Sequence, residues 1–336
     1  MKKTSNEKNN DQLNERGKDK VIIKDLSISY KTSSRTVVAA DRMSFTIEDG
    51  EGIGIIGESG SGKSTVGYGI MRSLPENGLI ESGSVLYEGI NLLEIPKKEF
   101  DEIYRWKKIS MVFQGSMNSL DPVFTIKNQM REILLTHRKD FTKKDELNNV
   151  IHNALEDVGL DPSFVLNKYP HELSGGMKQR IGIANALLAD PTLLIADEPT
   201  TALDVVTQAQ ILQLLKKLKK ENKMRIIIIT HDMSLIPNLV DKLIIMYAGQ
   251  AIEISDVSSV FEKPLHPYTQ ALIQSIPKIN STEKNIRFIR GNPPDLATVG
   301  RGCRFRDRCP KAFDKCGLDP PEFYVDKNLV KCWLYE

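Results

Sequence analysis

The chain has 336 residues, 40% of them hydrophobic and 27% charged, which is typical of a soluble globular protein of about two domains. Its 46 basic and 44 acidic side chains leave a formal net charge of +2, which gives no indication of a broad nucleic-acid-binding surface. The longest purely aliphatic run is Ile226–Ile229, far short of the roughly 20 apolar residues that a membrane-spanning helix needs.

The chain begins with a polar tail, and a series of β-strands is predicted after it. Residues 1–20 are almost wholly polar and charged, so we expect a disordered tail there, without the apolar core of a secretory signal. Alternating patterns at Val21–Tyr30 and Met43–Ile47 predict two half-buried strands. The apolar run Gly52–Gly57 predicts a buried strand that leads into a glycine loop. Further strands are predicted at Ile109–Phe113, Leu193–Asp197 and Ile226–Thr230, and a hairpin over Leu243–Ile254.

Amphipathic helical patterns separate these strands. The clearest pattern has four apolar residues at helical spacing, with four lysines on the opposite side. The apolar residues are Ile211, Leu214, Leu215 and Leu218. Alternating strands and helices predict an α/β fold with a mainly parallel sheet. After about residue 260 prolines become dense and periodicity fades, so we divide the chain into a first domain over 21–260 and a C-terminal region over 261–336.

The glycine loop matches a known phosphate-binding pattern. Gly57–Thr65, with the sequence GESGSGKST, fits G-x-x-x-x-G-K-S/T between a predicted buried strand and a predicted helix. The glycines let backbone N–H groups turn toward phosphate oxygens, and the helix dipole adds positive charge. Lys63 would contact the β- and γ-phosphates, and Ser64 would bind Mg²⁺. The predicted phosphate-site residues are Gly57, Ser59, Gly60, Ser61, Gly62, Lys63, Ser64 and Thr65.

A second acidic motif follows the predicted strand that ends at residue 197. Asp197 would hold Mg²⁺ through water, and Glu198, one residue later, could polarise an attacking water as a general base. The alternative is an ordinary strand end with surface acids. Because a phosphate loop precedes this motif in the same predicted sheet, the catalytic interpretation is favoured.

A third motif, Leu173–Met177 with the sequence LSGGM, precedes a predicted helix. Ser174 can cap that helix, while Gly175 and Gly176 expose backbone N–H groups, so a second anion site is predicted. A simple serine cap with a glycine turn is the alternative. Two phosphate sites on one chain suggest ATP bound between subunits. With these motifs in this order, the chain resembles the nucleotide-binding subunits of ABC transporters, whose signature is this segment.

The resemblance implies roles for other residues. Tyr30 stands where the family's aromatic side chain stacks on adenine, and Gln114 looks like the glutamine that senses Mg²⁺ and the attacking water. Thr201–Asp204 resembles the D-loop, in which Asp204 would lie against the partner subunit. His231 looks like the switch histidine that contacts the γ-phosphate. The implied Mg²⁺ ligands are therefore Ser64, Gln114 and Asp197.

The resemblance also implies a fold and a mechanism. The fold would be a P-loop NTPase cassette with a mainly parallel sheet, an antiparallel β subdomain and a helical subdomain that carries the signature. Two such subunits would close head to tail around ATP, and this closure would move membrane subunits before hydrolysis resets them. A single set of motifs without sustained heptads argues against a soluble ABC ATPase of DNA repair or translation.

All four cysteines lie within the last 34 residues, at Cys303, Cys309, Cys316 and Cys332. Gaps of five, six and fifteen residues do not match zinc fingers, and stable disulfides are rare in the cytosol. Spacing alone leaves zinc, an iron–sulfur cluster and four reduced thiols in a loop-rich module as alternatives, with redox sensing or metal storage as an added role.

Segments Pro264–Thr269 and Gly291–Leu296 resemble the C-terminal region of peptide-transporter ATPases, which serve dipeptides, oligopeptides and, in some members, nickel or metallophores. Gly302–Phe305 and Arg308–Pro310 fit that subfamily's cysteine region. The resemblance implies a 4Fe-4S cluster held by the four cysteines in a small irregular C-terminal module.

The implied assembly has several partners. Residues 71–83 look closer to the D-type ATPase of these transporters than to the F-type, which implies a heterodimer with a second, homologous ATPase. Two membrane permeases and an extracellular solute-binding protein would complete the importer, and no nucleic acid is implied. The chain would act at the cytoplasmic face of the membrane as a peripheral subunit that hydrolyses ATP to drive peptide uptake.

Overall fold

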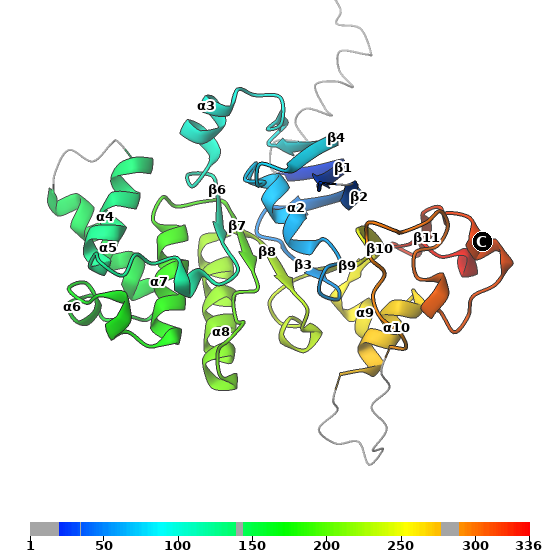
Figure 1. The fold of residues 1–336 in the computed structure, drawn as a ribbon. Coiled ribbons are helices and arrows are strands. Elements are labelled where there is room, and N and C mark those ends of the chain that lie inside the picture. Colours follow the sequence, from blue (N-terminus) through cyan, green and yellow to red (C-terminus); the bar gives the residue numbers. More distant parts are fainter. Residues whose placement is uncertain (1–19, 34, 139–143, 277–288) are drawn as a thin grey trace, which may run out of the picture.

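Two β-sheets organise the chain (Figure 1). The computed structural model describes residues 20–33, 35–138, 144–276 and 289–336, so the predicted tail 1–20 lies outside the described residues except for Lys20. The strands are β1 (Lys20–Lys31), β2 (Thr36–Glu48), β3 (Gly52–Ile56), β4 (Gly78–Tyr87), β5 (Ile90–Asn91), β6 (Ile109–Val112), β7 (Leu193–Asp197), β8 (Arg225–Thr230), β9 (Lys242–Tyr247), β10 (Gln250–Asp256), β11 (Phe323–Val325) and β12 (Asn328–Val330).

The helices lie mainly between strands of the larger sheet, as the alternating pattern predicts. They are α2 (Lys63–Ile70), α3 (Lys97–Glu99), α4 (Ile126–His137), α5 (Lys144–Asp157), α6 (Pro162–Val165), α7 (Gly175–Leu187), α8 (Val205–Asn222), α9 (Val257–Glu262) and α10 (Pro267–Gln274). Helices α4–α7 lie together beyond the β6 end of the sheet (Figure 1). This group contains the predicted helical subdomain.

The larger sheet has the strand order β11-β12-β10-β9-β3-β8-β7-β6. Strands β9, β3, β8, β7 and β6 run parallel, and Ile55 of β3 lies opposite Ile229 of β8. Because parallel strands end at the same edge of a sheet, the residues that follow β3, β6, β7 and β8 are brought together there. All predicted catalytic residues follow one of these four strands.

The central strands are apolar throughout because both of their faces are covered. In β8, Ile227 and Ile229 belong to one core cluster, with α2 and the smaller sheet, while Ile226 and Ile228 belong to the other, with α7 and α8. Each of these isoleucines is at most 1% exposed. A strand buried on both faces reads as an unbroken apolar run, so the predicted buried strand is confirmed.

The smaller sheet is antiparallel, with the order β2-β1-β4-β5. Its inner residues include Val21, Ile23, Leu26 and Ile28, which pack into the same cluster as α2. The alternation of buried and exposed side chains in β1 and β2 follows from one face being covered. The predicted antiparallel β subdomain is therefore present.

The last residues of the chain extend the larger sheet. Strand β12 pairs antiparallel with β10, where Val330 lies opposite Glu253, and β11 pairs with β12. The remainder of this region consists largely of turns and short 3-10 segments. The predicted separate cysteine module is not confirmed as a unit of its own, and the domain boundary near residue 260 stays a prediction.

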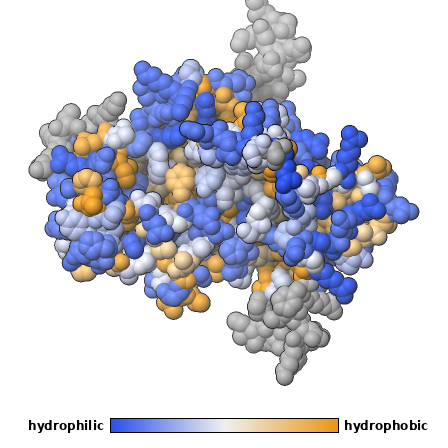
Figure 2. Space-filling view, viewed as in Figure 1, coloured by the Kyte–Doolittle hydropathy of each residue, from blue (hydrophilic) through white to orange (hydrophobic). Residues whose placement is uncertain are grey.

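The face of the molecule drawn in Figure 2 is mostly hydrophilic, with hydrophobic side chains in small separate groups. Among the described residues, no helix combines the length and the apolar character that crossing a membrane requires.

Two buried polar residues hold the start of α10. Glu253 of β10 is fully buried, and its carboxyl accepts hydrogen bonds from the N–H groups of Leu265 (3.1 Å) and His266 (2.8 Å). Nδ1 of His266 accepts from the N–H of Tyr268 at 3.0 Å, which caps the helix. Burial lowers the pKa of His266 to about 3, so its imidazole is neutral in the folded chain.

This buried histidine predicts acid sensitivity. Unfolded histidine protonates near pH 6.5, whereas His266 stays neutral in the fold, so the stability that it contributes is present above pH 6.5 and is lost as pH falls. His266→Asn keeps a capping side chain that cannot protonate. Between pH 6.5 and 4.5 the unfolding free energy of the variant should fall by about 2 kcal/mol less than that of the unmodified chain. Urea unfolding at both pH values measures this, and equal losses would contradict it.

Candidate functional site

The loop Gly57–Thr65 connects β3 to α2, as the sequence predicts. Gly62 has φ +94°, and a Cβ there would lie 1.8 Å from the carbonyl oxygen of Ala39. The Nζ of Lys63 donates to the carbonyl oxygens of Gly57 and Glu58, at 2.8 Å each. The loop therefore curls back around its own lysine, and glycine is required where it passes β2.

Two hydroxyl groups of this loop are available to a ligand. Ser61 Oγ is buried and has no hydrogen-bond partner among the described residues. Ser64, in the first turn of α2, donates from its hydroxyl to Oδ1 of Asp197 at 3.0 Å. A buried polar atom without a partner is unusual in folded proteins, and a ligand bound in this loop would supply a partner for Ser61 Oγ.

Asp197, the last residue of β7, is fully buried. Its Oδ2 is the second buried atom near this loop that lacks a hydrogen-bond partner among the described residues. Burial raises the pKa of Asp197 to about 6, and the adjacent Glu198 carboxylate acts in the same direction. A cation bound beside Asp197 would offset the free-energy cost of burying its negative charge. Asp197 and Ser64 together supply the oxygen atoms that Mg²⁺ prefers.

Glu198 lies at the centre of a hydrogen-bond network. Its Oε1 lies 3.0 Å from Nδ1 of His231, and its Oε2 accepts from Oγ1 of Thr201 at 2.8 Å and from Nε2 of Gln114 at 3.1 Å. The residue has φ +46°, a conformation that L-residues rarely adopt, and its N–H donates to the carbonyl of Ile229. Strained backbone of this kind is often found at functional sites.

The same contacts set the charge of Glu198. Burial raises its pKa, but the hydrogen bonds from His231 and Thr201 outweigh burial, so the pKa lies below its usual value. Glu198 is thus a carboxylate at neutral pH and able to accept a proton. Gln114, Glu198 and His231, predicted from three separate stretches of sequence, are brought together in the structure.

The signature and the D-loop lie beside one another. Ser174 caps α7 by accepting from the N–H of Met177 at 3.3 Å, and Asp204 caps α8 by accepting from the N–H groups of Val206 and Thr207. A Cβ on Gly176 would lie 2.7 Å from Cγ2 of Thr207, so the starts of the two helices are in close contact. No hydrogen bond between described residues connects this corner to the loop Gly57–Thr65 of the same chain.

A buried hydrogen bond connects the segment after Gln114 to the signature helix. Ser116 Oγ donates to Oε1 of Gln179 at 2.9 Å, and both side chains are buried. Ser116→Ala leaves the amide oxygen of Gln179 unpaired, so the free energy of unfolding should fall by about 1–3 kcal/mol. Ser258→Ala, at an exposed position of α9, should cost less than about 0.5 kcal/mol. Chemical denaturation measures both values, and similar losses would contradict the assignment.

Tyr30 lies near the start of α2. Its hydroxyl is 3.2 Å from Oγ1 of Thr65, and its ring lies next to Gly78. Adenine stacking on this ring stays a prediction.

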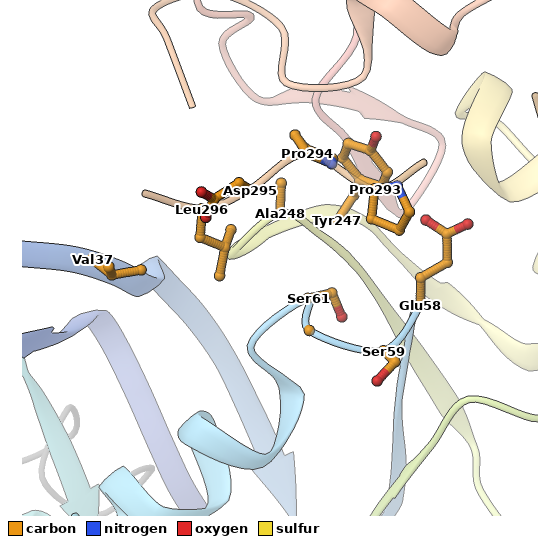
Figure 3. A pocket seen from close by; sticks show the side chains of 11 residues that line it. Val37, Glu58, Ser59, Ser61, Tyr247, Ala248, Pro293, Pro294, Asp295 and Leu296 are labelled. Carbon is orange, nitrogen blue, oxygen red and sulfur yellow. The ribbon is translucent and has the colours of Figure 1, made fainter. Parts of the chain in front are cut away.

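A cavity of about 330 Å³ lies beside the loop Gly57–Thr65 (Figure 3). Glu58 and Ser61 line it from the loop, Tyr247 and Ala248 from the end of β9, and 293–296 from the opposite side. The C-terminal region therefore forms one wall of a cavity whose other wall is the phosphate loop. None of the sequence motifs indicates this contact.

The comparisons with known proteins agree with this geometry. Residues 40–201 match the family model described as ABC transporter, and residues 252–316 match the model for the oligopeptide/dipeptide transporter C-terminal region. The oligopeptide transport ATP-binding protein OppD of Escherichia coli is 41% identical over 93% of this chain and 92% of its own length. The chain belongs to the oligopeptide and dipeptide transport ATP-binding proteins of ABC transporters.

Other relatives support the assignment. OppD of Bacillus subtilis is 43% identical over 93% of this chain and 88% of its own length. The dipeptide transport ATP-binding protein DppD of Caldanaerobacter subterraneus is 42% identical over 94% of this chain and 97% of its own length. Among solved structures, the ATP-binding cassette MJ0796 bound to ADP and Pi is 29% identical, with a TM-score of 0.62 over 70% of this chain and 98% of its own. This ABC subunit is therefore an ATP-hydrolysing enzyme with the cassette fold, and its family implies membrane permease partners.

The predicted iron–sulfur site at Cys303, Cys309, Cys316 and Cys332 is wrong. Over residues 20–33, 35–138, 144–276 and 289–336, no group of three or more His, Cys, Asp or Glu side chains is arranged to hold a metal ion. The same finding applies to zinc. All four cysteines are free thiols.

The environment of the cysteines gives the physical reason. Cys303 and Cys309 pack against the main core, and Cys332 belongs to a small cluster with Leu265 and Val330. Burial raises the pKa of Cys303 to about 11, and the three other thiols act in the same direction. Burial also raises the pKa values of Cys309 and Cys332, so without a bound metal these thiols are protonated at neutral pH. They act as small apolar side chains, which corresponds to the reduced-thiol alternative.

Proposed function

We propose that this ABC subunit powers the uptake of dipeptides or oligopeptides through partner membrane permeases. The convergence of Gln114, Glu198 and His231 beside the phosphate loop carries the ATPase part of the proposal. The names of the relatives support peptides as the solute. They favour peptides over nickel or metallophores, and a soluble ABC ATPase is disfavoured by the match to a transporter C-terminal region.

The proposed nucleotide site combines the phosphate loop with Tyr30. Backbone N–H groups of 57–65 and the start of α2 would hold the phosphates of ATP, with Lys63 released from Gly57 and Glu58 to contact them. Tyr30 would stack on the adenine. The unpartnered hydroxyl of Ser61 supports a phosphate ligand at this place.

Mg²⁺ fits the oxygen atoms beside this loop. Ser64 and Asp197 would hold it, the latter through water, with Gln114 completing the proposed set, and the unpartnered Oδ2 of Asp197 supports the fit. When bound, Mg²⁺ supplies positive charge that offsets the negative charge developing on the phosphate oxygens. Asp197 must be ionised for this role, and its raised pKa would return toward the usual value beside a cation.

The reaction that follows depends mainly on positioning. Glu198 would accept a proton from the attacking water, Gln114 would orient that water, and His231 would contact the γ-phosphate while fixing the Glu198 carboxylate. We assign the signature residues Ser174, Gly175 and Gly176 to the ATP bound by the partner subunit. Asp204 would lie at the same subunit interface.

The proposed assembly is a head-to-tail heterodimer with a second, homologous ATPase. Two permeases and an extracellular solute-binding protein would complete it, with this chain at the cytoplasmic face of the membrane. The division into a cassette over 21–260 and a C-terminal region over 261–336 belongs to the same proposal. The match to two family models, over 40–201 and 252–316, supports such a division.

Reconstitution tests the proposal. The chain would be combined with its second ATPase and permeases in lipid vesicles, with the binding protein supplied on the opposite side, and hydrolysis of Mg·ATP measured with a tripeptide, a dipeptide or Ni²⁺. We expect peptide-stimulated hydrolysis and peptide uptake, both abolished by Lys63→Ala. Stimulation by Ni²⁺ without a response to peptide would refute peptide transport, and absence of hydrolysis in every condition would refute the assigned site.

A further inference from the structure

The carboxylate of Glu58 occupies an unusual place, inside the loop proposed to bind a polyanion. Both hydrogen bonds that the described residues make to this carboxylate come from Arg308, at 2.6 Å from Nη1 and 2.9 Å from Nη2. Arg308 lies in the C-terminal region, 250 residues later in the chain. A paired bidentate contact of this kind is the strongest geometry available between these groups.

Arg308 is held rigidly. Besides Glu58, its guanidinium donates to the hydroxyl of Tyr247 at 3.2 Å and to the carbonyl oxygens of Arg290 (2.9 Å) and Gly291 (3.3 Å). These contacts use all five N–H donors of the side chain, which is only 7% exposed. Lysine has neither the planar fork nor the donor number to replace it.

The backbone of Glu58 is fixed from the same region. Its N–H donates to the hydroxyl of Tyr268 at 3.0 Å, and Tyr268 is fully buried in α10. The rings of Tyr247, Tyr268 and Phe305 pack edge to face, with centroids 4.7–5.4 Å apart. One end of the phosphate loop is therefore clamped, at both backbone and side chain, by residues that lie outside the cassette's nucleotide motifs.

We propose that Arg308 is a positioning residue for ATP, which neutralises the Glu58 carboxylate and fixes the entry of the phosphate loop. Without Arg308, a partly buried and unpaired negative charge would remain beside the triphosphate, and the loop would lose a fixed point at its second residue. The C-terminal region thus contributes directly to nucleotide affinity. The inference rests on the proposed ATP site and adds to it a requirement for a residue 245 positions after Lys63.

Charge removal in two steps tests the proposal on the full-length chain. Arg308→Gln should raise the dissociation constant of Mg·ATP about tenfold, a factor typical of coupling between sites. Glu58→Gln added to Arg308→Gln removes the unpaired charge, so the double variant should recover to within about threefold of the unmodified chain. Titration with a fluorescent ATP analogue measures the affinities, and thermal melting shows that each variant is folded.

Arg304→Gln is the matched control. Arg304 is in the same segment and makes an ion pair of 2.5 Å with Asp41 of β2, whose carboxyl also accepts from Gln250. Arg304→Gln removes an ion pair of the C-terminal region but leaves no unpaired charge in the phosphate loop. The dissociation constant of Mg·ATP should therefore stay within about twofold of that of the unmodified chain. Equal weakening by Arg304→Gln and Arg308→Gln, or no recovery in the double variant, would overturn the proposal. If the unmodified chain itself bound no Mg·ATP, the proposed function would fail instead.

Discussion

Glu198→Gln is expected to lower kcat for ATP hydrolysis by about 10²–10⁴-fold, the contribution usual for a general base. The amide keeps the size of the side chain. Its oxygen can still accept the hydrogen bonds that Thr201 and Gln114 donate to Glu198. It cannot take a proton from water, however. The affinity for Mg·ATP should change little, because none of the proposed phosphate contacts is removed.

Steady-state hydrolysis and equilibrium binding measure the two parts separately. Glu221→Gln, on the exposed side of α8, makes the same chemical change away from the site and should leave kcat unchanged. Normal turnover by Glu198→Gln would remove this residue from the mechanism. A loss of ATP binding along with turnover would instead show that the carboxylate acts through the structure of the loop.

Gly62→Ala should be the most destabilising single change in the phosphate loop. The added Cβ would lie 1.8 Å from the carbonyl oxygen of Ala39, and the φ of +94° is unfavourable for any residue with a Cβ. Moving the loop or β2 aside, together with this backbone strain, should lower the free energy of unfolding by at least ~3 kcal/mol. ATP binding should be lost with it.

Gly60→Ala separates these two costs. Gly60 has φ +79°, but a Cβ there meets no atom within 4 Å, so only the backbone strain of roughly 1–2 kcal/mol applies. Urea unfolding of both variants compares them without reference to ATP. If both variants lost equal stability, the close approach of Gly62 to Ala39 would not be the reason that glycine is needed at position 62.

The sheet and its site residues were largely predictable from local patterns. The isoleucine run of β8 indicates a strand covered on both faces, and Gly57–Thr65 specifies strand, loop and helix at once. Because parallel strands end at one edge of a sheet, the positions of Gln114, Glu198 and His231 directly after predicted strands were enough to predict that they lie together. Each of these predictions depends on residues within about ten positions of one another.

The features that the sequence did not predict depend on contacts between distant parts of the chain. Nothing near Arg308 in the sequence indicates that its partner is Glu58, because the contact depends on how α10 and the C-terminal turns fold back onto β9. Likewise, Arg304 and Arg308 lie next to cysteines in the sequence, but both form ion pairs with carboxylates of the cassette. The cysteines were assigned from spacing and resemblance, and neither reports the burial that raises the pKa of Cys303.

Strand β12 has a consequence for the solution behaviour of the chain. It pairs with β10 at Glu253 and Ile254, and the N–H of Lys331 donates to the carbonyl of Ile252. An open strand edge with free N–H and C=O groups is a template for pairing with other chains, and proteins often end their sheets with very short strands. Here the outermost strand, β11, has three residues, so at this edge of the ATPase sheet only a short template for pairing is exposed.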